Sequence, residues 1–313
     1  KPRSVLDSYS PEMAAKIEQL IAENKFDLII ASQIGSAGYG SLFQNIPAIF
    51  EEAEMGIYYE QLGQANSVKS RLRYKLTLAK QERYLRDVLQ YFDACTVVSQ
   101  PEQALVKTAV PHYPNVEIIP NCMNLADYEQ IRVEKRPNSL IFTGSFTYHV
   151  NHEAMVWYLR EVNGLVQAQI PDVHLSITGD HANMPLPPAS NITLTGFVDD
   201  IRSLIASSCI SLVPIFMGGG TRLKILEAMA LRTAVVATSK GAEGLDVVDG
   251  KHLLLADTPQ EFAQAVLRLL HDPDLYKQIA DSGYQLIKQK YDWPSVTPQF
   301  LNLVERTAEV GKV

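Results

Sequence analysis

Short apolar segments that fit β-strands alternate with longer segments of helical periodicity along almost the whole 313-residue chain. Most of the strand segments are continuous apolar runs, as expected for strands that are covered on both faces. This alternation is typical of parallel sheets joined by crossover helices. The sequence therefore predicts an α/β fold, with strands at 27–32, 47–51, 94–99, 116–119, 138–143, 173–178, 192–194, 209–214, 233–237 and 252–255.

The helical segments have identifiable starts and apolar faces. Ser10 is a favourable N-cap and Pro11 fits the first helical position, so a helix is expected from here to about Ala22. The other predicted helices lie at 66–92, 151–170, 199–207, 221–231, 259–271, 273–290 and 294–308.

A charged stretch from Glu129 to Arg136, followed by Pro137 and a new strand, marks a domain boundary. We predict a first domain over residues 1–130, a second over 138–290, and a terminal helical segment over 291–313. Because the chain begins without methionine and inside an α/β alternation, we expect the first domain to lack its N-terminal start.

The composition narrows the classes of function. With 28 Lys and Arg against 35 Asp and Glu, the net charge is −7, which argues against a nucleic-acid-coating protein. The longest apolar runs, such as 210–216, are too short to span a bilayer. Cys95, Cys122 and Cys209 are scattered and form no Cys-x-x-Cys motif, so we expect reduced thiols in a cytoplasmic protein.

The most informative segment is 214–230, which reads PIFMGGGTRLKILEAMA. A buried strand ends, three glycines follow, and a helix is predicted to begin at about Thr221. Glycines permit close approach of a ligand to the backbone, and a helix N-terminus offers unpaired N–H groups and a positive dipole end. The segment therefore predicts a phosphate-binding loop.

Within the predicted helix, Gly220, Lys224 and Glu227 share one face by their spacing. A cation and a carboxylate on that face suit a diphosphate and a neighbouring pair of sugar hydroxyls. The opposite face is predicted to carry Leu223, Leu226 and Ala230. The segment matches neither a P-loop nor a Gly-x-Gly-x-x-Gly fingerprint. A glycine-rich connection with a Lys224–Glu227 surface pair explains the residues equally well.

Motifs along residues 95–310 resemble those of glycosyltransferase family four, the group 1 glycosyltransferases of the GT-B fold. The match is strongest in the second domain and depends on several motifs together. These are Pro120-Asn121-Cys122-Met123-Asn124, Phe142-Thr143-Gly144-Ser145-Phe146 with Asn151, Leu175 to Gly179, Thr195 to Val198, the glycine loop, Ala234 to Thr238 with Gly241 to Gly244, and Tyr291-Asp292-Trp293.

The resemblance implies two Rossmann-like domains that face each other across a cleft, the first of them partial here, with the terminal helix crossing back to it. It implies transfer of a sugar from a nucleoside-diphosphate-sugar donor to a glycan, lipid-linked or polysaccharide acceptor, with retention of configuration. It also implies catalysis without a divalent metal or a cofactor. Cell-envelope polysaccharide biosynthesis would be the setting.

The resemblance assigns roles to residues of the second domain. Glu227 would bind the donor ribose, Arg222 and Lys224 would hold the diphosphate together with the loop backbone, and Val198 would meet the base. The predicted catalytic residues are accordingly Glu227, Arg222 and Lys224. The predicted donor-binding residues are Gly144, Gly179, Val198, Gly218, Gly219, Gly220, Thr221, Arg222, Lys224 and Glu227.

The sequence departs from the family pattern at two positions in this domain. Gly219 stands where members carry a glutamate that contacts the transferred sugar. The Arg and Lys that members usually carry after the first glycine of this domain are also absent, because Gly144 is followed by Ser145 to His149. Arg222 and Lys224 are candidates to replace the missing cations. His149 and His152 are spaced i, i+3, but no third ligand is nearby, so no metal site is predicted.

Two other functions are compatible with the sequence. One is a nucleotide-sugar-binding module that is inactive as this fragment, and the other is a nucleotide-sugar epimerase of the same architecture. The helix at 66–92 is rich in Lys and Arg. A solvated helix face explains this composition, and a peripheral contact with anionic lipid at the inner face of a membrane is the alternative.

Overall fold

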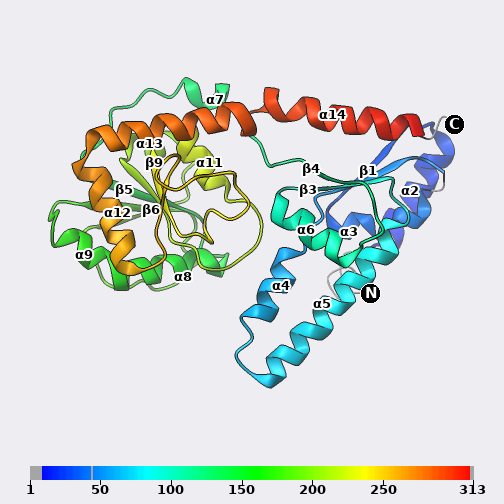
Figure 1. Cartoon of the computed structure of the whole chain (residues 1–313), viewed down its shortest axis with the longest axis horizontal. Helices are drawn as coiled ribbons and strands as arrows, with labels where there is room; N and C mark the ends of the chain where they lie inside the picture. The colour runs from blue at the N-terminus through cyan, green and yellow to red at the C-terminus, as the bar shows by residue number, and fades with distance from the viewer. Residues whose placement is uncertain (1–8, 44, 311–313) are drawn as a thin grey trace. The chain divides into compact units, whose positions relative to one another are not determined.

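The computed structural model describes residues 9–43 and 45–310. The chain forms two compact units. The colours of Figure 1 follow the residue number through both. The first unit contains the residues up to Asn121 and those from Val296 onward, and the second contains Cys122–Ser295. The sequence placed the boundary a few residues later, in the charged stretch before Asn138.

The first unit contains a parallel four-stranded sheet in the order β1-β2-β3-β4. Its strands are β1 (Ile29–Ser32), β2 (Ala48–Glu51), β3 (Ala94–Val97) and β4 (Val116–Ile118). Its helices are α2 (Pro11–Glu23), α3 (Gln33–Ala37), the 3-10 turn η1 (Gly40–Leu42), α4 (Gly56–Gly63), α5 (Val68–Leu89), α6 (Gln100–Ala109) and most of α14 (Trp293–Val310).

Specific side chains explain how these helices start and pack. The Ser10 hydroxyl accepts a 3.2 Å hydrogen bond from the N–H of Met13, so the predicted cap of α2 is confirmed. On α14, Leu303 is buried with Ile49 of β2 and Ala94 of β3. The terminal helix therefore belongs to the core of the first unit along most of its length.

The second unit contains a parallel six-stranded sheet in the order β10-β9-β8-β5-β6-β7. Its strands are β5 (Ser139–Thr143), β6 (His174–Thr178), β7 (Ile192–Gly196), β8 (Ile210–Val213), β9 (Ala234–Ala237) and β10 (Leu254–Leu255). The helices are α7 (Ala126–Glu129), α8 (His149–Trp157), α9 (Asn163–Gln167), α10 (Arg202–Ser207), α11 (Leu223–Ala230), α12 (Pro259–His271) and α13 (Pro273–Leu286), with π-helical turns at Tyr158–Val162 (η2) and Ile287–Tyr291 (η3).

The strand order determines where a ligand site can form in this unit. The chain runs outward from β5 through β6 to β7, returns to β8 beside β5, and then runs outward through β9 to β10. This is the order of a doubly wound Rossmann sheet, whose direction reverses between β5 and β8. In such sheets ligands bind in the crevice outside the carboxyl ends of the strands at the reversal point. In this chain that crevice lies beyond Thr143 and Val213.

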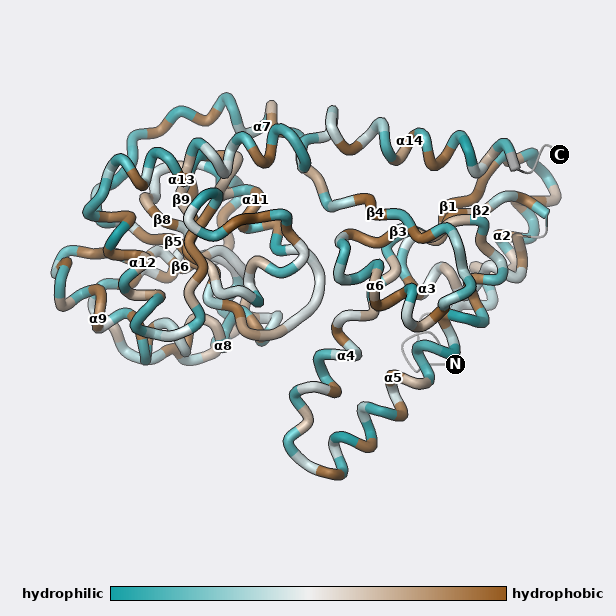
Figure 2. The backbone as a smooth tube through the Cα atoms, viewed as in Figure 1, coloured by the Kyte–Doolittle hydropathy of each residue, from teal (hydrophilic) through white to brown (hydrophobic). Residues whose placement is uncertain are grey.

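Each predicted strand segment overlaps an observed strand, and the α/β prediction is confirmed. Hydrophobic stretches follow the strands of both sheets in Figure 2, as expected for strands buried on both faces. The predicted helix at 151–170 is divided into α8, η2 and α9. The sequence analysis missed α3, α4, α6 and α7, of which α3 and α7 are a single turn or little more.

Candidate functional site

A pocket of about 430 Å³ lies at the reversal point of the second unit's sheet. It is formed by the ends of β5 and β6, the loop after β7, the segment after β8 and the first turns of α11. The lining residues are Thr143, Gly144, Tyr148, Asn151, Thr178, Gly179, Phe197, Val198, Ile201, Ile215, Thr221, Arg222, Leu223, Lys224 and Glu227.

Two glycines allow the turns after β5 and β6 to pack directly against each other. Gly179 has φ +109°, and a Cβ there would lie 2.8 Å from the backbone of Gly144 and Ser145. Gly144 has φ +152°, and a Cβ there would lie 2.7 Å from the amide nitrogen of Asn151. Any side chain at either position would overlap its neighbours, so both glycines are required to form the floor of the pocket.

The glycine loop is held by the side chain of Arg222. Its guanidinium donates hydrogen bonds to the carbonyl oxygens of Met217, Gly218 and Gly219, the first at 3.1 Å. Arg222 is also the N-cap residue of α11, which begins at Leu223 rather than at Thr221. The loop glycines Gly218 and Gly220 have φ +95° and +74°. Arg222 thus fixes a backbone path that favours glycine.

Lys224 presents a desolvated ammonium to the pocket. Its Nζ donates a 2.9 Å hydrogen bond to Oδ1 of Asn151 and lies 4.2 Å from the centroid of the Phe142 ring. Burial, followed by the nearby Arg222 guanidinium, lowers the pKa of Lys224 to about 7. A cation with this pKa is half-protonated near neutral pH, and an anionic ligand in the pocket would favour the charged form.

Glu227 lies one turn further along α11 and also lines the pocket. Its Oε1 accepts a 3.3 Å hydrogen bond from the Tyr128 hydroxyl on α7. Burial raises the pKa of Glu227, while the Tyr128 hydrogen bond and the Lys224 charge act in the opposite direction. The predicted shared face is confirmed for Lys224 and Glu227, which reach the same pocket, but not for Gly220, which precedes α11 and does not line the pocket. Each is hydrogen-bonded to a partner outside α11 and is partly buried, so Lys224 and Glu227 are not an exposed surface pair, although their charges interact.

The loop after β7 forms the opposite wall of the pocket. Phe197 is 78% exposed and Val198 follows it in the lining. Further along this loop, Arg202 makes a bidentate pair with Asp200, at 2.8 and 2.9 Å, and donates to the carbonyl of Asp127. The wall is therefore tied to the segment that carries Tyr128.

The structure brings seven of the predicted donor-binding residues into this pocket: Gly144, Gly179, Val198, Thr221, Arg222, Lys224 and Glu227. Gly218, Gly219 and Gly220 shape the adjoining loop. The prediction that Leu223 lies on the face opposite Lys224 and Glu227 is wrong, because its side chain is 51% exposed and lines the same pocket. The reason is that α11 starts two residues later than predicted, so Leu223 occupies its first position.

Sequence reasoning missed Tyr148 and Phe197 as residues of this pocket. It also missed Tyr128, which lines a neighbouring pocket and bonds to Glu227. Tyr128 lies 99 residues from Glu227 in sequence, and no local pattern relates the two. Among the described residues, no group of three or more His, Cys, Asp or Glu side chains is placed to hold a metal ion. His152 instead contacts the carbonyl oxygen of Pro185, 2.9 Å from its Nε2.

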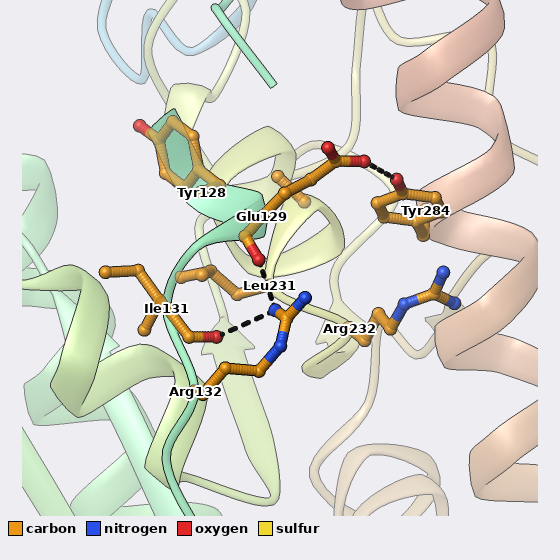
Figure 3. A pocket seen from close by; sticks show the side chains of 8 residues that line it. Tyr128, Glu129, Ile131, Arg132, Leu231, Arg232 and Tyr284 are labelled. Carbon is orange, nitrogen blue, oxygen red and sulfur yellow. Dashed lines mark hydrogen bonds between the residues drawn. The ribbon is translucent and has the colours of Figure 1, made fainter. Parts of the chain in front are cut away.

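A second pocket, of about 380 Å³, lies behind α7 (Figure 3). In it the Tyr284 hydroxyl donates to the Glu129 carboxylate, and the Arg232 guanidinium lies 3.8 Å from the centroid of the Tyr284 ring. Arg232 also pairs with Asp281. The charges of this pocket compensate one another, and its contacts fix α7 against α13.

Comparison with known proteins identifies the family of the second unit. Residues 137–272 match the family model described as Glycosyl transferases group 1. This segment is a group 1 glycosyltransferase domain. The family resemblance inferred from the sequence motifs is thereby confirmed.

Curated relatives of the glycosyltransferase domain are distant in sequence. An uncharacterized 44.6 kDa protein in the cps region of Klebsiella pneumoniae is 23% identical over 248 residues, which cover 75% of this chain and 62% of that protein. Phosphatidyl-myo-inositol mannosyltransferase of Mycolicibacterium smegmatis is 26% identical over 206 residues, covering 62% of this chain and 52% of that enzyme. The chain thus spans less than two thirds of the length of these relatives.

Solved structures confirm the GT-B fold. Sucrose-phosphate synthase from Thermosynechococcus elongatus superposes with a TM-score of 0.72 at 20% identity, covering 98% of this chain and 80% of that enzyme. Anabaena HepE in complex with UDP superposes with a TM-score of 0.69 at 16% identity, covering 94% of this chain and 82% of HepE.

Proposed function

We propose that the pocket of the second unit binds a nucleoside-diphosphate sugar and that the protein transfers the sugar to an acceptor hydroxyl. The observation that carries the proposal is the placement of Lys224 and Glu227 in one pocket at the reversal point of a Rossmann sheet. The HepE structures with UDP and with UDP-glucose support this ligand class.

In this proposal the diphosphate lies over the glycine loop and the start of α11. Lys224 and the backbone N–H groups there stabilise the negative charge that develops as the sugar leaves the β-phosphate. These donors supply the charge stabilisation in our proposal, without a divalent metal or a cofactor. Arg222 contributes by holding the loop in shape, and a direct contact of Arg222 with the phosphates is part of the proposal.

Glu227 accepts the ribose hydroxyls through the carboxylate oxygens that Tyr128 leaves available, and the backbone of Val198 meets the base beside Phe197. The bond between the sugar and the β-phosphate breaks, and one to the acceptor oxygen forms with retention of configuration. The acceptor is a glycan, lipid-linked or polysaccharide hydroxyl, a class supported by the cps-region relative and the mannosyltransferase. We assign the acceptor side to the first unit.

Calorimetric titration with UDP, GDP and ADP tests donor binding. Arg222→Ala and Lys224→Ala should each weaken binding of the preferred diphosphate by roughly 1.5–3 kcal/mol, since each removes a charge-assisted interaction. Unchanged affinity in both variants contradicts the diphosphate assignment. Release of nucleoside diphosphate on addition of donor and acceptor, in the presence of EDTA, distinguishes a metal-independent transferase from a binding module.

We also propose a peripheral membrane contact through α5, on the cytoplasmic side. Within the described residues no helix combines the length and apolarity needed to span a membrane. On α5, Val68, Leu72 and Leu76 are exposed at i, i+4, i+8 spacing, and Figure 2 shows hydrophobic and hydrophilic segments alternating along the helix. Its exposed basic residues are Lys69, Arg71, Arg73, Lys75, Lys80, Arg83 and Arg86. An apolar stripe flanked by cations suits an anionic lipid surface.

Co-sedimentation with vesicles tests the membrane proposal. The protein should pellet with phosphatidylglycerol-containing vesicles and not with pure phosphatidylcholine, and Leu72→Asp should reduce the pelleted fraction. Equal partitioning of both proteins with both vesicle types contradicts a role of α5.

A further inference from the structure

Asn151 makes a contact that the family resemblance does not explain. It lies in the first turn of α8, is buried, and its Oδ1 accepts the 2.9 Å hydrogen bond from the Lys224 ammonium. The Phe142 ring covers another side of that ammonium at 4.2 Å. An aromatic face and one carbonyl oxygen therefore define where the charge of Lys224 lies.

The orientation of the Asn151 amide is fixed by its own partners. Its Nδ2 donates a 2.8 Å hydrogen bond to the carbonyl oxygen of Ser145. Because an ammonium can only donate and a backbone carbonyl can only accept, the amide has one orientation that satisfies both contacts. The missing side chain at Gly144 leaves the space that this amide fills.

The neutral amide of Asn151 accepts from Lys224 and leaves the charge of the ammonium intact. An amide oxygen occupies one of the three donors of the ammonium without neutralising its charge, and two donors stay available to a ligand. A carboxylate at the same position would cancel the charge that an anionic ligand requires. The charged groups that act on Lys224 are Arg222, beside it, and Glu227, one turn along α11.

The titratable groups of α8 are directed elsewhere. The His152 ring contacts the Pro185 carbonyl, and the His149 ring packs edge-on against Tyr148 at 5.8 Å. Asn151 is thus the polar side chain of α8 that contacts the Lys224 ammonium.

We propose that Asn151 is a positioning residue, which holds the Lys224 ammonium charged and correctly placed for the diphosphate of the donor. It acts through Lys224 and does not itself contact the phosphates. The inference rests on the proposed function, because it takes the diphosphate as the ligand of Lys224.

A double-mutant cycle tests this inference, with UDP, GDP or ADP as the probe, whichever the wild type binds most tightly. In the wild-type background, Asn151→Ala should weaken binding roughly fivefold at pH 7.5, which is within the range for the net loss of one ordinary hydrogen bond. In the Lys224→Ala background the same substitution should change affinity less than about twofold. Glu153→Ala, on the exposed side of α8, is the matched control and should bind like wild type.

The outcomes separate the two proposals. If Asn151→Ala weakens binding equally in both backgrounds, Asn151 acts through the Ser145 loop and the positioning role is overturned. If Lys224→Ala binds as tightly as wild type, the diphosphate assignment fails, and the positioning role fails with it.

The pH profile gives a readout that a general structural defect would not move. Loss of the acceptor in Asn151→Ala favours the neutral amine, so the loss of affinity should be greater at pH 8 than at pH 6. Asn151→Asp keeps the side-chain volume and supplies a negative acceptor, so its affinity should decline at a higher pH than that of the wild type. Identical pH midpoints in all three proteins would overturn the inference even if one variant is less stable.

Discussion

The hydroxyl of Tyr128 lies 3.3 Å from Oε1 of Glu227 and donates a hydrogen bond to it. The first residue belongs to the short helix α7 and the second to α11, so the bond fixes the carboxylate from outside its own helix. Burial raises the pKa of Tyr128 to about 12, so the phenol remains a donor throughout the neutral and acidic pH range. One carboxylate oxygen is thereby held, and the other is left for a ligand.

Tyr128→Phe should weaken binding of a nucleoside diphosphate about two- to tenfold at pH 7, the range expected for loss of one hydrogen bond. Without the Tyr128 donor, the already raised pKa of Glu227 rises further. Because the ionised Glu227 carboxylate accepts the ribose hydroxyls, affinity should fall as the pH decreases. In Tyr128→Phe this fall should occur at a higher pH than in the wild type. Calorimetry between pH 5 and 7.5 measures both effects. If affinity falls at the same pH in the variant and the wild type, the role of Tyr128 is contradicted.

Glu227→Ala should cost more than Tyr128→Phe, and Glu227→Gln should lose about 1–2 kcal/mol of donor binding, since it keeps the shape but loses the charge. The specific expectation concerns ligand chemistry. The wild type should discriminate a ribonucleoside diphosphate from its 2′,3′-dideoxy analogue, whereas Glu227→Ala should bind the two alike. Equal discrimination by both proteins would leave Glu227 as a structural residue.

The sequence predicted the sheets well because burial on both faces produces continuous apolar strands such as Leu140–Phe142 and Ala234–Ala237. It also singled out the segment that lines the candidate pocket, because the loop glycines, Lys224 and Glu227 lie within ten residues of one another. That Lys224 and Glu227 reach one pocket follows from local helix geometry together with the reversal of strand order between β5 and β8.

The partners of those residues could not be predicted, because they come from distant segments. Asn151 reaches Lys224 across 73 residues, and Tyr128 reaches Glu227 across 99. Nor did the sequence indicate that the Arg222 side chain bonds to the carbonyls of its own loop. Cationic residues after a glycine loop suggest a ligand contact, and only the fold shows which of them contacts the backbone.

Lys224→Met should stabilise the protein while it weakens diphosphate binding. The pKa of Lys224 is lowered to about 7 in the folded state, below its ordinary value of 10.5. Between these values the unfolded chain binds more protons, so the contribution of Lys224 to stability increases with pH from 7 to 10. At pH 6.5 the desolvation of the buried charged amine destabilises the folded state. Lys224→Met should therefore raise the free energy of unfolding by about 1 kcal/mol. Urea titrations at pH 6.5 and 9 measure this, and a larger gain at pH 9 would contradict the argument.

Gly179→Ala should destabilise the second unit by about 2–4 kcal/mol, because the new Cβ would overlap backbone atoms at 2.8 Å in a left-handed conformation. Gly164→Ala is the matched control. Gly164 lies in α9, and a Cβ there meets nothing within 4 Å. In a helix this substitution should be neutral or stabilising by up to about 1 kcal/mol. Similar urea midpoints for the two variants would show that the turns after β5 and β6 can separate without cost.

A fragment of residues 122–295 should fold and bind nucleotide, whereas a fragment of 138–290 should be much less stable. The shorter fragment lacks the backbone pairing in which Met123 donates to Tyr291 and accepts from Trp293, both at 2.9 Å. It also loses the buried side chains of Leu125 and Tyr291, each worth about 1.5–3 kcal/mol of burial.

Losses of this size approach the whole stability of an ordinary domain, about 5–15 kcal/mol. The 122–295 fragment should therefore unfold cooperatively in urea and show a ligand-dependent midpoint, and the 138–290 fragment should unfold at a far lower urea concentration. The two fragments should also differ in affinity for the diphosphate, because the shorter fragment lacks Tyr128 and its hydrogen bond to Glu227. It should bind the diphosphate no more tightly than the longer fragment carrying Tyr128→Phe. Equal stability and equal affinity of the two fragments would show that the segment before Asn138 is a linker and not part of the donor-binding unit.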